Sequence, residues 1–318
     1  MTILPALQAM FDGINGQARP SVSGDPAKSR AEAHARMEEG YLKLCAQHPP
    51  VRWEQDFEVP VEGGTITVRL YSCGDGSESR PCYLYMHGGA YWMGALTHVE
   101  ATCRALAKDV GCNVVSVDYR LAPEHKFPTA PNDCMAALRW VAENAEDLGV
   151  DSTRIAIGGE SAGGGLAAAL ALMARDHGGP RIVFQILETP VTDFTRLEPL
   201  ERPSEGVSVD IGKRVWRSYY LSDGAEATHP YASPLLAPDL ANLPSALVVT
   251  AEYDNLCREG EEYAERLAEA GTKVEYICLS GQFHGSNRLS ALIPEEAQAY
   301  HLTIVTALRR ALTLLADG

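Results

Sequence analysis

The sequence has little that would attach the protein to a membrane or a nucleic acid. No run of apolar residues approaches the roughly 18 that a membrane-spanning helix needs. Positive charge is scarce, because 27 Lys and Arg residues stand against 42 Asp and Glu residues and leave a formal net charge of −15. Nucleic acids and anionic membrane surfaces repel an acidic protein. We therefore expect neither a membrane nor a nucleic acid among its partners.

Paired cysteine motifs are also missing, and we expect no secretion leader. None of the eight cysteines forms a C-x-x-C pair and no metal-ligand spacing is visible, so we expect no bound metal. Most cysteines have apolar neighbours, as Cys278 does in VEYICL, and are predicted to be small core side chains. The first residues, MTILPALQAMFDGING, contain no basic region followed by a long apolar stretch and a cleavage site. A reducing, cytoplasmic setting is the expectation that follows.

Apolar runs alternate with helical patterns along most of the chain. Six nearly continuous apolar runs are predicted to be strands buried on both faces, at residues 83–86, 114–117, 155–158, 182–187, 246–250 and 274–278. Two earlier segments, 52–59 and 65–71, alternate in polarity and suit an antiparallel edge. Helices are predicted from Thr97, with Thr97 and Glu100 as a capping box, and over residues 130–145, 162–175, 259–270 and 294–315. This alternation predicts an α/β protein with a mostly parallel, doubly wound sheet.

Two regions interrupt the alternation and divide the chain. Residues 1–50 hold a polar helical stretch at 26–47 before any strand, and residues 194–235 place a loop and a short helix at 210–221 between two strands. We expect both to form a cap over the carboxyl edge of a core made of residues 51–193 and 236–318; the alternative is peripheral decoration. The apolar residues expected to face a ligand are Leu7, Met10, Phe11, Val215, Trp216 and Tyr219.

A G-x-S-x-G run at residues 159–163 is the strongest chemical signal. It follows the predicted strand RIAIG and opens a helix of small residues. A serine on so sharp a strand-to-helix turn needs glycine neighbours, because any Cβ there would collide with the adjacent strand or helix. Ser161 is therefore the candidate nucleophile, at a helix N-terminus that favours developing negative charge. The alternative is a helix-capping serine in a glycine-rich loop.

A second motif, His87-Gly88-Gly89-Ala90, follows the predicted strand YLYM. Consecutive glycines let backbone amides approach a substrate carbonyl, as an oxyanion hole requires. The amides of Gly88 and Gly89 are the expected donors, joined by the amide of Ala162 after the nucleophile. His87 is expected to fix the loop.

A nucleophilic serine needs a base, and the base needs an orienting carboxylate. His284 lies in GQFHG just beyond a predicted strand, whereas His301 falls in a helical pattern and His125 in RLAPEHKFP. Asp254 follows the strand ALVVTAEY and is favoured over Glu252, because it lies farther past the strand. The order Ser161, Asp254, His284 is typical of α/β-hydrolases.

These segments resemble the hormone-sensitive-lipase-like esterases of bacteria. The similarity rests on HGGAYWMG, DYRLAPEHKFPTAPND, GGESAGGGLA, TAEYDNLCREG and GQFHG, which follow the family's order from about residue 80 to 290. The resemblance implies an α/β-hydrolase fold with an eight-stranded, mostly parallel sheet, flanking helices and a helical cap. It also implies hydrolysis of short-to-medium acyl esters without any cofactor.

Four positions depart from the family pattern and leave the substrate open. They are Glu160 before the nucleophile, Asn255 after the acid, Glu188 at a strand end, and Ser286 after the His-Gly pair. Glu188 and Ser286 are expected to make the pocket more polar. A lactone or amide hydrolase, an acyltransferase and a non-catalytic ligand binder are the alternatives, although the plant gibberellin receptors that resemble this family have lost the histidine kept here as His284. The sequence does not determine the oligomeric state; a homodimer is one candidate.

Overall fold

A single mixed sheet forms the centre of the structure. The computed structural model describes residues 2–16, 25–75, 78–197, 200–202, 207–209 and 212–313. Its eight-stranded sheet has the order β1-β2-β4-β3-β5-β6-β9-β10. The strands are β1 (Trp53–Val61), β2 (Gly64–Ser72), β3 (Arg80–Met86), β4 (Asn113–Asp118), β5 (Val150–Glu160), β6 (Ile182–Glu188), β9 (Ser245–Tyr253) and β10 (Val274–Phe283). All eight predicted strands are thus confirmed.

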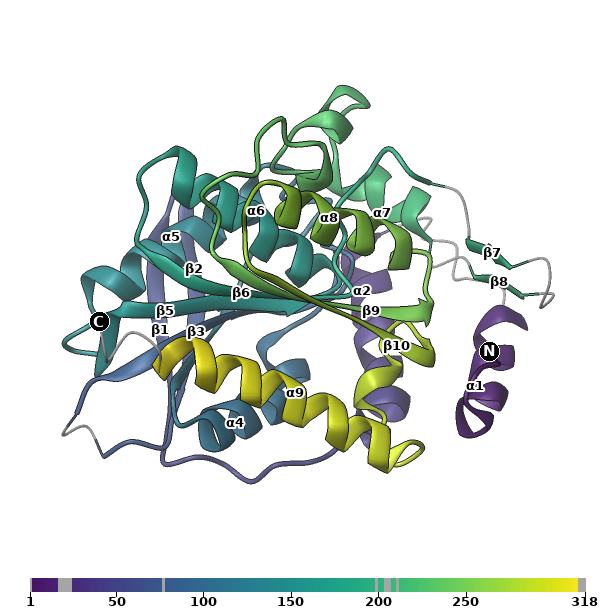
Figure 1. Cartoon of the computed structure of the whole chain (residues 1–318), viewed down its shortest axis with the longest axis horizontal. Helices are drawn as coiled ribbons and strands as arrows, with labels where there is room; N and C mark the ends of the chain where they lie inside the picture. Colours follow the sequence, from purple (N-terminus) through teal and green to yellow (C-terminus); the bar gives the residue numbers. More distant parts are fainter. Residues whose placement is uncertain are drawn as a thin grey trace.

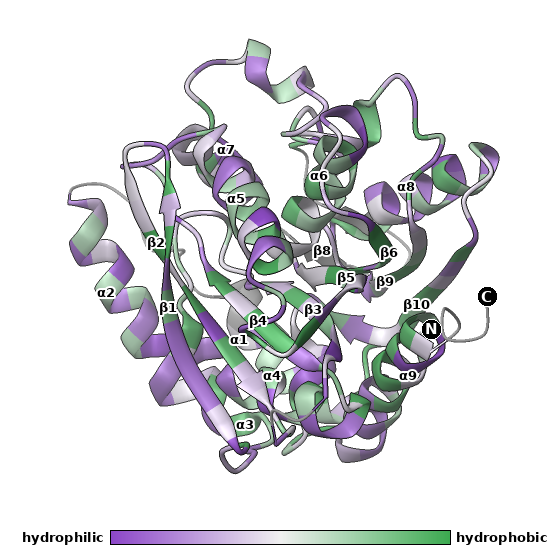
Figure 2. Ribbon diagram, turned by 90° about the vertical axis from the view of Figure 1, so that its left-hand side faces the viewer, coloured by the Kyte–Doolittle hydropathy of each residue, from purple (hydrophilic) through white to green (hydrophobic). Residues whose placement is uncertain are grey.

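The sheet is parallel from β4 to β10 and antiparallel only at β1 and β2. The central strands are apolar on both faces because helices cover both faces. The outermost strand β1 alternates instead, and Figure 2 shows it largely hydrophilic. The parallel order places the carboxyl ends of β3, β5, β6, β9 and β10 at one edge, where the loops that follow them converge.

Helices form a layer on each side of the sheet. In Figure 1, α4 (Leu96–Val110) and α9 (Pro294–Thr313) cover one face, and α5 (Thr129–Glu143), α6 (Ala162–Asp176) and α8 (Cys257–Glu269) cover the other. Each layer packs its own apolar cluster against the sheet. The predicted helices are confirmed within a few residues; residues 314 and 315 of the last one lie outside the described residues.

The capping box predicted at Thr97 is wrong. Helix α4 begins at Leu96, and its N-cap is Ala95, which has no side chain able to cap the helix. Glu100 instead forms an ion pair with Arg104 one turn later. The helix start is therefore fixed by tertiary packing of its apolar side, which includes the buried Leu96, and not by a local cap.

The two irregular regions lie beside the carboxyl edge of the sheet. The first contains α1 (Pro5–Gly16), α2 (Pro26–Arg36), a π-helical turn η1 (Met37–Tyr41) and α3 (Leu42–Leu44). Arg30 attaches α2 to the core through the carbonyls of Trp92 and Ala122, at 2.6 and 2.9 Å, and through Glu124. The helix predicted over 26–47 is confirmed over 26–44, as a stretch that changes type at Met37 and ends three residues earlier than predicted.

The second irregular region contains β7 (Leu200–Arg202), β8 (Val207–Val209) and helix α7 (Lys213–Tyr220). Residues 210 and 211 of the predicted short helix lie outside the described residues. The first residue of α7, Lys213, forms a buried ion pair with Glu259 of α8. Glu259 also accepts hydrogen bonds from the amides of Thr192 and Asp193, so α7 is fixed to the core at its N-terminus. No helix in the described part of the chain is long and apolar enough to cross a membrane.

Candidate active site

Ser161 occupies a strained turn between β5 and α6. Its φ and ψ are 58° and −115°, a conformation that a non-glycine residue holds only when its surroundings enforce it. The amide of Ser161 donates to the Glu188 carbonyl at 2.8 Å, and the Ser161 carbonyl accepts from Gly165 at 3.0 Å and from Val191 at 3.2 Å. The turn is therefore held on both sides, by the end of β6 and by the first turn of α6.

Glycines at 159 and 163 let the turn close. A Cβ on Gly159 would lie 2.1 Å from the Met86 carbonyl oxygen, and one on Gly163 would lie 2.0 Å from the same atom. Real Cβ atoms do not approach so closely, so neither position accepts a side chain without displacing β3 or α6. The steric argument made from the G-x-S-x-G motif is confirmed.

His284 connects Ser161 to Asp254. Its Nε2 lies 3.0 Å from Ser161 Oγ, and its Nδ1 lies 2.6 Å from Asp254 Oδ2. Asp254 is fully buried, and its Oδ1 accepts a hydrogen bond from the Leu256 amide at 3.0 Å. The carboxylate is thus oriented by its own loop, and it fixes the imidazole with Nε2 directed at the hydroxyl. These are the three residues singled out from the sequence.

The rival groups lie elsewhere. Glu252 accepts hydrogen bonds from the Gly281 amide at 2.8 Å and from the Ser280 hydroxyl at 2.9 Å, so it holds the end of β10. His301 pairs with Asp109, at 2.8 Å. His87 is buried, stacks on Tyr119 with ring centroids 4.3 Å apart, and has its Nδ1 2.7 Å from the Gly88 carbonyl. Burial lowers the pKa of His87 to about 4, so its ring is neutral at neutral pH.

The pKa of His284 is raised above its ordinary value. Burial disfavours the charged ring and opposes the shift, but the charge and hydrogen bond of Asp254, together with the charge of Glu160, outweigh burial. A histidine in this environment holds a proton more firmly than a free imidazole does. Glu160, an unusual residue before the nucleophile, therefore contributes to the electrostatics of the imidazole.

The loop after β3 brings two amides beside Ser161. A Cβ on Gly88 would lie 3.0 Å from the Glu160 carbonyl oxygen and 3.6 Å from the Ser161 Cβ, which places this loop against the turn. Gly89 has a φ of 121°, which L side chains rarely adopt. Within the described ranges, the amides of Gly88 and Gly89 have no hydrogen-bond partner, and Ala162 is the first residue of α6. The two glycine amides are therefore unoccupied in a loop that packs against the turn of Ser161.

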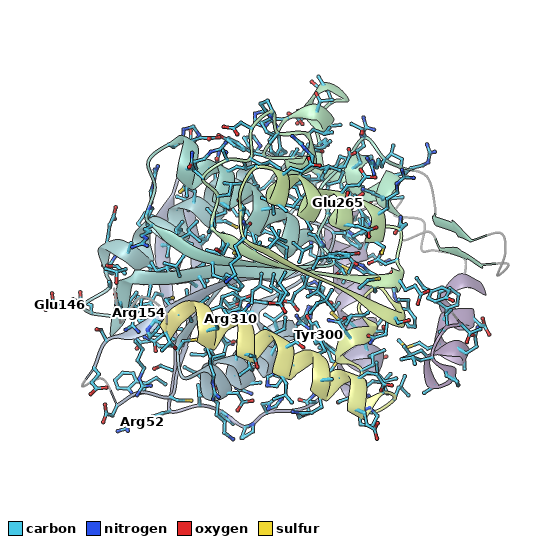
Figure 3. The ribbon with its side chains drawn as sticks, in the orientation of Figure 1. Arg52, Glu146, Arg154, Glu265, Tyr300 and Arg310 are labelled. Atoms are coloured by element: carbon cyan, nitrogen blue, oxygen red, sulfur yellow. The ribbon has the colours of Figure 1, made fainter. Side chains whose placement is uncertain are left out.

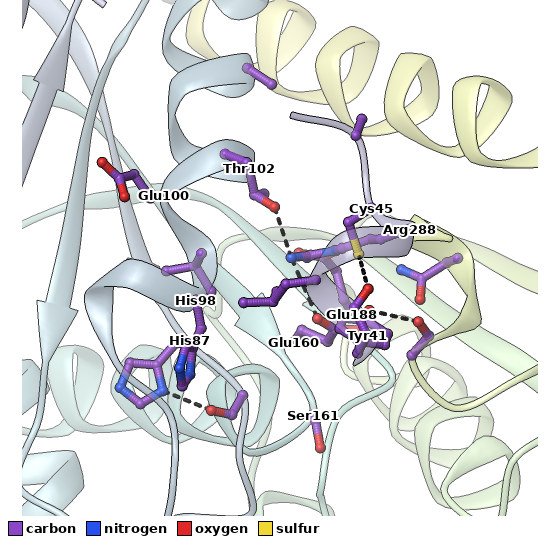
Figure 4. A pocket seen from close by; sticks show the side chains of 18 of the residues that line it. Tyr41, Cys45, His87, His98, Glu100, Thr102, Glu160, Ser161, Glu188 and Arg288 are labelled. Carbon is purple, nitrogen blue, oxygen red and sulfur yellow. Dashed lines mark hydrogen bonds and ion pairs between the residues drawn. The ribbon is translucent and has the colours of Figure 1, made fainter. Parts of the chain in front are cut away.

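A cavity of about 600 Å³ lies over these groups. Figure 4 shows Ser161 at one side of it and Tyr41, Cys45, Glu160 and Arg288 at another. Parts of the N-terminal region, including Met37, Tyr41 and Leu42, form one wall, and Trp216 of α7 contributes to another. The Tyr41 hydroxyl donates to the Gly285 carbonyl at 2.7 Å, directly beside His284.

The prediction of which apolar residues face a ligand is mostly wrong. Of that set, Trp216 lines the cavity. Leu7 and Phe11 are buried in a separate apolar cluster with Tyr253 and Phe283, and Met10 packs against that cluster. Val215 is exposed, and Tyr219 packs edge-on against Trp92. Helical spacing identified an apolar side of α1, but spacing does not tell which surface that side meets.

Sequence reasoning missed Arg288, whose guanidinium joins two carboxylates at the wall of the cavity. It lies 2.8 Å from Glu188 and 3.5 Å from Glu160, and it also donates to the hydroxyls of Tyr85 at 2.9 Å and Thr102 at 3.2 Å. Tyr300 of α9, labelled in Figure 3, donates to Glu188 as well. Burial raises the pKa of Glu188, and the charge of Arg288 opposes that shift.

This network gives the departures Glu160 and Glu188 a common partner. Glu188 does line the cavity, as expected, but its charge is balanced by Arg288. The polar role expected for Ser286 is wrong, because its buried hydroxyl accepts from the Phe283 amide at 3.1 Å and caps the loop that carries His284. Among the described residues, no group of three or more His, Cys, Asp or Glu side chains is arranged to hold a metal ion.

The chain is similar to known proteins in both sequence and structure. A family model described as the α/β-hydrolase fold matches residues 83–287. An arylesterase of Saccharolobus solfataricus is 40% identical over 258 residues, which cover 78% of this chain and 83% of that protein. An ethyl acetate hydrolase of Pseudomonas putida is 37% identical over 98% of this chain and 99% of its own. A solved hyperthermophilic esterase from the archaeon Pyrobaculum calidifontis superposes with a TM-score of 0.87 at 36% identity, covering 98% of this chain and 99% of that one.

The chain therefore belongs to the α/β-hydrolase family, in its hormone-sensitive-lipase-like branch, and the resemblance found in the sequence is confirmed. Its relatives are named as esterases from bacteria and archaea. The protein is a carboxylic ester hydrolase.

Replacing Arg288 by methionine should destabilise the fold. The change leaves Glu188 and Glu160 without their cation in a largely buried site, and breaking such a pair from one side costs about 3–5 kcal/mol. The matched control is Arg310→Met on α9, labelled in Figure 3. Arg310 pairs with Glu275, which is half exposed, so that change should cost less than about 1 kcal/mol. Urea unfolding measures both. If Arg288→Met lowered the free energy of unfolding no more than Arg310→Met does, the Arg288 network would not be stabilising.

Proposed function

We propose that the protein cleaves carboxylic esters through a catalytic triad of Ser161, His284 and Asp254 and an acyl-enzyme intermediate. The observation that carries this proposal is the continuous hydrogen-bond chain from Ser161 Oγ through His284 to Asp254, at 3.0 and 2.6 Å. Both distances lie in the range that proton transfer between a nucleophile and its base requires.

The first half of the reaction forms the acyl-enzyme. His284 Nε2 takes the proton as Ser161 Oγ attacks the ester carbonyl, and the tetrahedral oxyanion forms. Asp254 holds the imidazole in the tautomer with a proton on Nδ1 and stabilises the imidazolium. His284 then donates its proton to the departing alcohol. A water molecule repeats both transfers, releases the carboxylic acid and restores Ser161.

The oxyanion would be stabilised by the amides of Gly88, Gly89 and Ala162. The proposal is supported by their position beside Ser161 and by the free donors of the glycine pair. One such donor is typically worth about 3–4 kcal/mol of transition-state stabilisation. The N-terminus of α6 adds positive partial charge at the same place. None of these steps needs a cofactor.

We propose esters of short-to-medium acyl chains as substrates. A cavity of about 600 Å³ accommodates small organic molecules, and the relatives include an ethyl acetate hydrolase and an arylesterase. Residues 1–50 and 194–235 would act as the cap, which excludes water from the oxyanion and contacts the substrate through residues such as Tyr41 and Trp216. A cytoplasmic location fits the eight cysteines, all free in the structure. A homodimer stays a prediction.

Replacing Ser161 by alanine should lower ester turnover by about 10⁶-fold, the loss seen when a serine-hydrolase nucleophile is removed. The wild-type protein should form a covalent adduct with an organophosphate at Ser161, located by peptide mass spectrometry. Ser290→Ala is the matched control, because Ser290 lines the same cavity without contacting His284. That variant should keep both turnover and labelling. An adduct at another serine with Ser161 unmodified would contradict the assignment.

Asp254→Asn should lower turnover by about four orders of magnitude, because an amide favours the wrong imidazole tautomer. Glu252→Gln should have far less effect, since a glutamine oxygen can still accept from the Gly281 amide. Steady-state kinetics of the two variants, compared at equal folded fraction, separate the roles. Equal losses would mean that Asp254 is not the orienting acid.

The value of kcat/KM should rise with pH through one ionisation above about 6.5, the ordinary pKa of histidine. The sign follows from the base: His284 acts when neutral, and its pKa is raised, so activity is lost as the pH falls through that value. Glu160→Gln removes a negative charge that favours the imidazolium, and the acid limb should move to lower pH. Glu275→Gln, on the exposed surface, should leave the limb in place. A Glu160→Gln profile identical to the wild type would contradict the electrostatic role of Glu160.

A further inference from the structure

Two cysteines outside the active site lie side by side. Cys257 is the first residue of α8 and Cys278 is in the edge strand β10, and their sulfur atoms are 3.8 Å apart. Cys278 lies opposite Thr250 in the β9–β10 register, and the Thr250 hydroxyl lies 3.5 Å from the Cys257 sulfur. The chain segments that carry the two thiols thus meet where α8 begins to cover the edge of the sheet.

The two thiols differ in access to solvent. Cys278 is exposed, which corrects the expectation that it is a core side chain, while Cys257 is buried beneath it. An oxidant in solution therefore reaches Cys278 first and finds a second thiol directly behind the first. This is the arrangement of a reactive cysteine with a resolving cysteine.

The neighbouring thiol also favours the thiolate on the exposed residue. A hydrogen bond from Cys257 lowers the pKa of Cys278 to about 6, against an opposing contribution from burial. The proton stays on Cys257, whose pKa is raised by the same hydrogen bond and by burial. The negative charge is thus favoured on Cys278 and the proton on Cys257, and the thiolate is the nucleophilic form of a cysteine.

We propose that Cys257 and Cys278 are a redox-active pair that closes to an intramolecular disulfide when the protein meets a peroxide. The Cys278 thiolate attacks the O–O bond of the peroxide and becomes a sulfenic acid, as the leaving oxygen takes up a proton and departs as water. The Cys257 thiol then attacks the Cys278 sulfur and loses its proton, and the sulfenic hydroxyl leaves as a second water. The two thiols are oxidised and one hydrogen peroxide is reduced. A dithiol reductant reverses the step.

Closing the bond requires only a small movement. The sulfur atoms must approach from 3.8 Å to about 2.05 Å. Cys257 is anchored, because its amide donates to the Asp254 carbonyl at 3.0 Å, whereas β10 is bonded to one neighbouring strand only. We therefore expect the edge strand β10 to move when the disulfide forms. Asp254 precedes Cys257 by three residues and β10 leads into His284, so the disulfide would join the two elements that carry the acid and the base.

The experiment counts thiols and does not depend on ester hydrolysis. The purified full-length protein is treated with a modest excess of hydrogen peroxide, denatured, alkylated with N-ethylmaleimide and digested without reduction. We expect the alkylated thiols to fall from eight to six and a peptide pair linked through Cys257 and Cys278 to appear. Dithiothreitol should restore all eight. The Ser161→Ala variant should give the same disulfide, which separates this proposal from the proposed catalytic mechanism.

Single substitutions provide the controls. Cys73→Ser removes the other exposed thiol and should leave the disulfide unchanged. Cys278→Ser, at an exposed position that does not threaten the fold, should abolish it. Cys257→Ser should leave Cys278 as a sulfenic acid that dimedone traps. Three results with the wild-type protein would overturn the proposal. Both thiols could remain open to alkylation after peroxide treatment, Cys278 could be oxidised to a sulfinic acid with no disulfide to Cys257, or the disulfide could join two chains.

Discussion

The close approach of α6 to the end of β3 is the constraint on which the site depends. The Met86 carbonyl oxygen lies where a Cβ on Gly159 or Gly163 would have to be, so strand, turn and helix can pack at this distance only without side chains. Ser161 lies between these two glycines in its strained conformation, with its hydroxyl 3.0 Å from His284 Nε2. Met86 is the last residue of β3, so the loop that follows, with Gly88 and Gly89, lies beside the same turn. One steric condition thus brings the proposed nucleophile and the glycine pair together.

Local patterns explain why so much of this arrangement could be predicted from sequence. Strands buried on both faces leave continuous apolar runs, and all of those identified are strands of the central sheet. The sheet then converts sequence position into spatial position: Ser161, Asp254 and His284 follow three different strands, yet they follow them at the same edge. The topology brings the three side chains together, and their donor and acceptor groups then form the two hydrogen bonds.

Features set by contacts between distant segments could not be predicted in this way. Arg288 stands in an unremarkable SNR turn, and its partners Glu188, Thr102 and Tyr85 are 100, 186 and 203 residues away in the sequence. Leu7 and Phe11 show a helical apolar side whose partner surface only the folded chain defines. Cys278 looks like a core residue from its apolar neighbours, but its strand is at the edge of the sheet and the side chain is exposed. The capping box at Thr97 failed for the same reason, since tertiary packing overrode a local preference.

The hydrogen bond from Tyr41 to the Gly285 carbonyl joins the N-terminal wall of the cavity to the loop that carries His284. Tyr41 belongs to the π-helical turn over the cavity, and Gly285 is the residue after His284. A cover that lifted at this point would break the bond and free the loop that aligns the imidazole. A ligand that entered on this side would therefore disturb the loop of His284, whereas one that entered on the other side, where Trp216 lines the wall, would leave that loop in place.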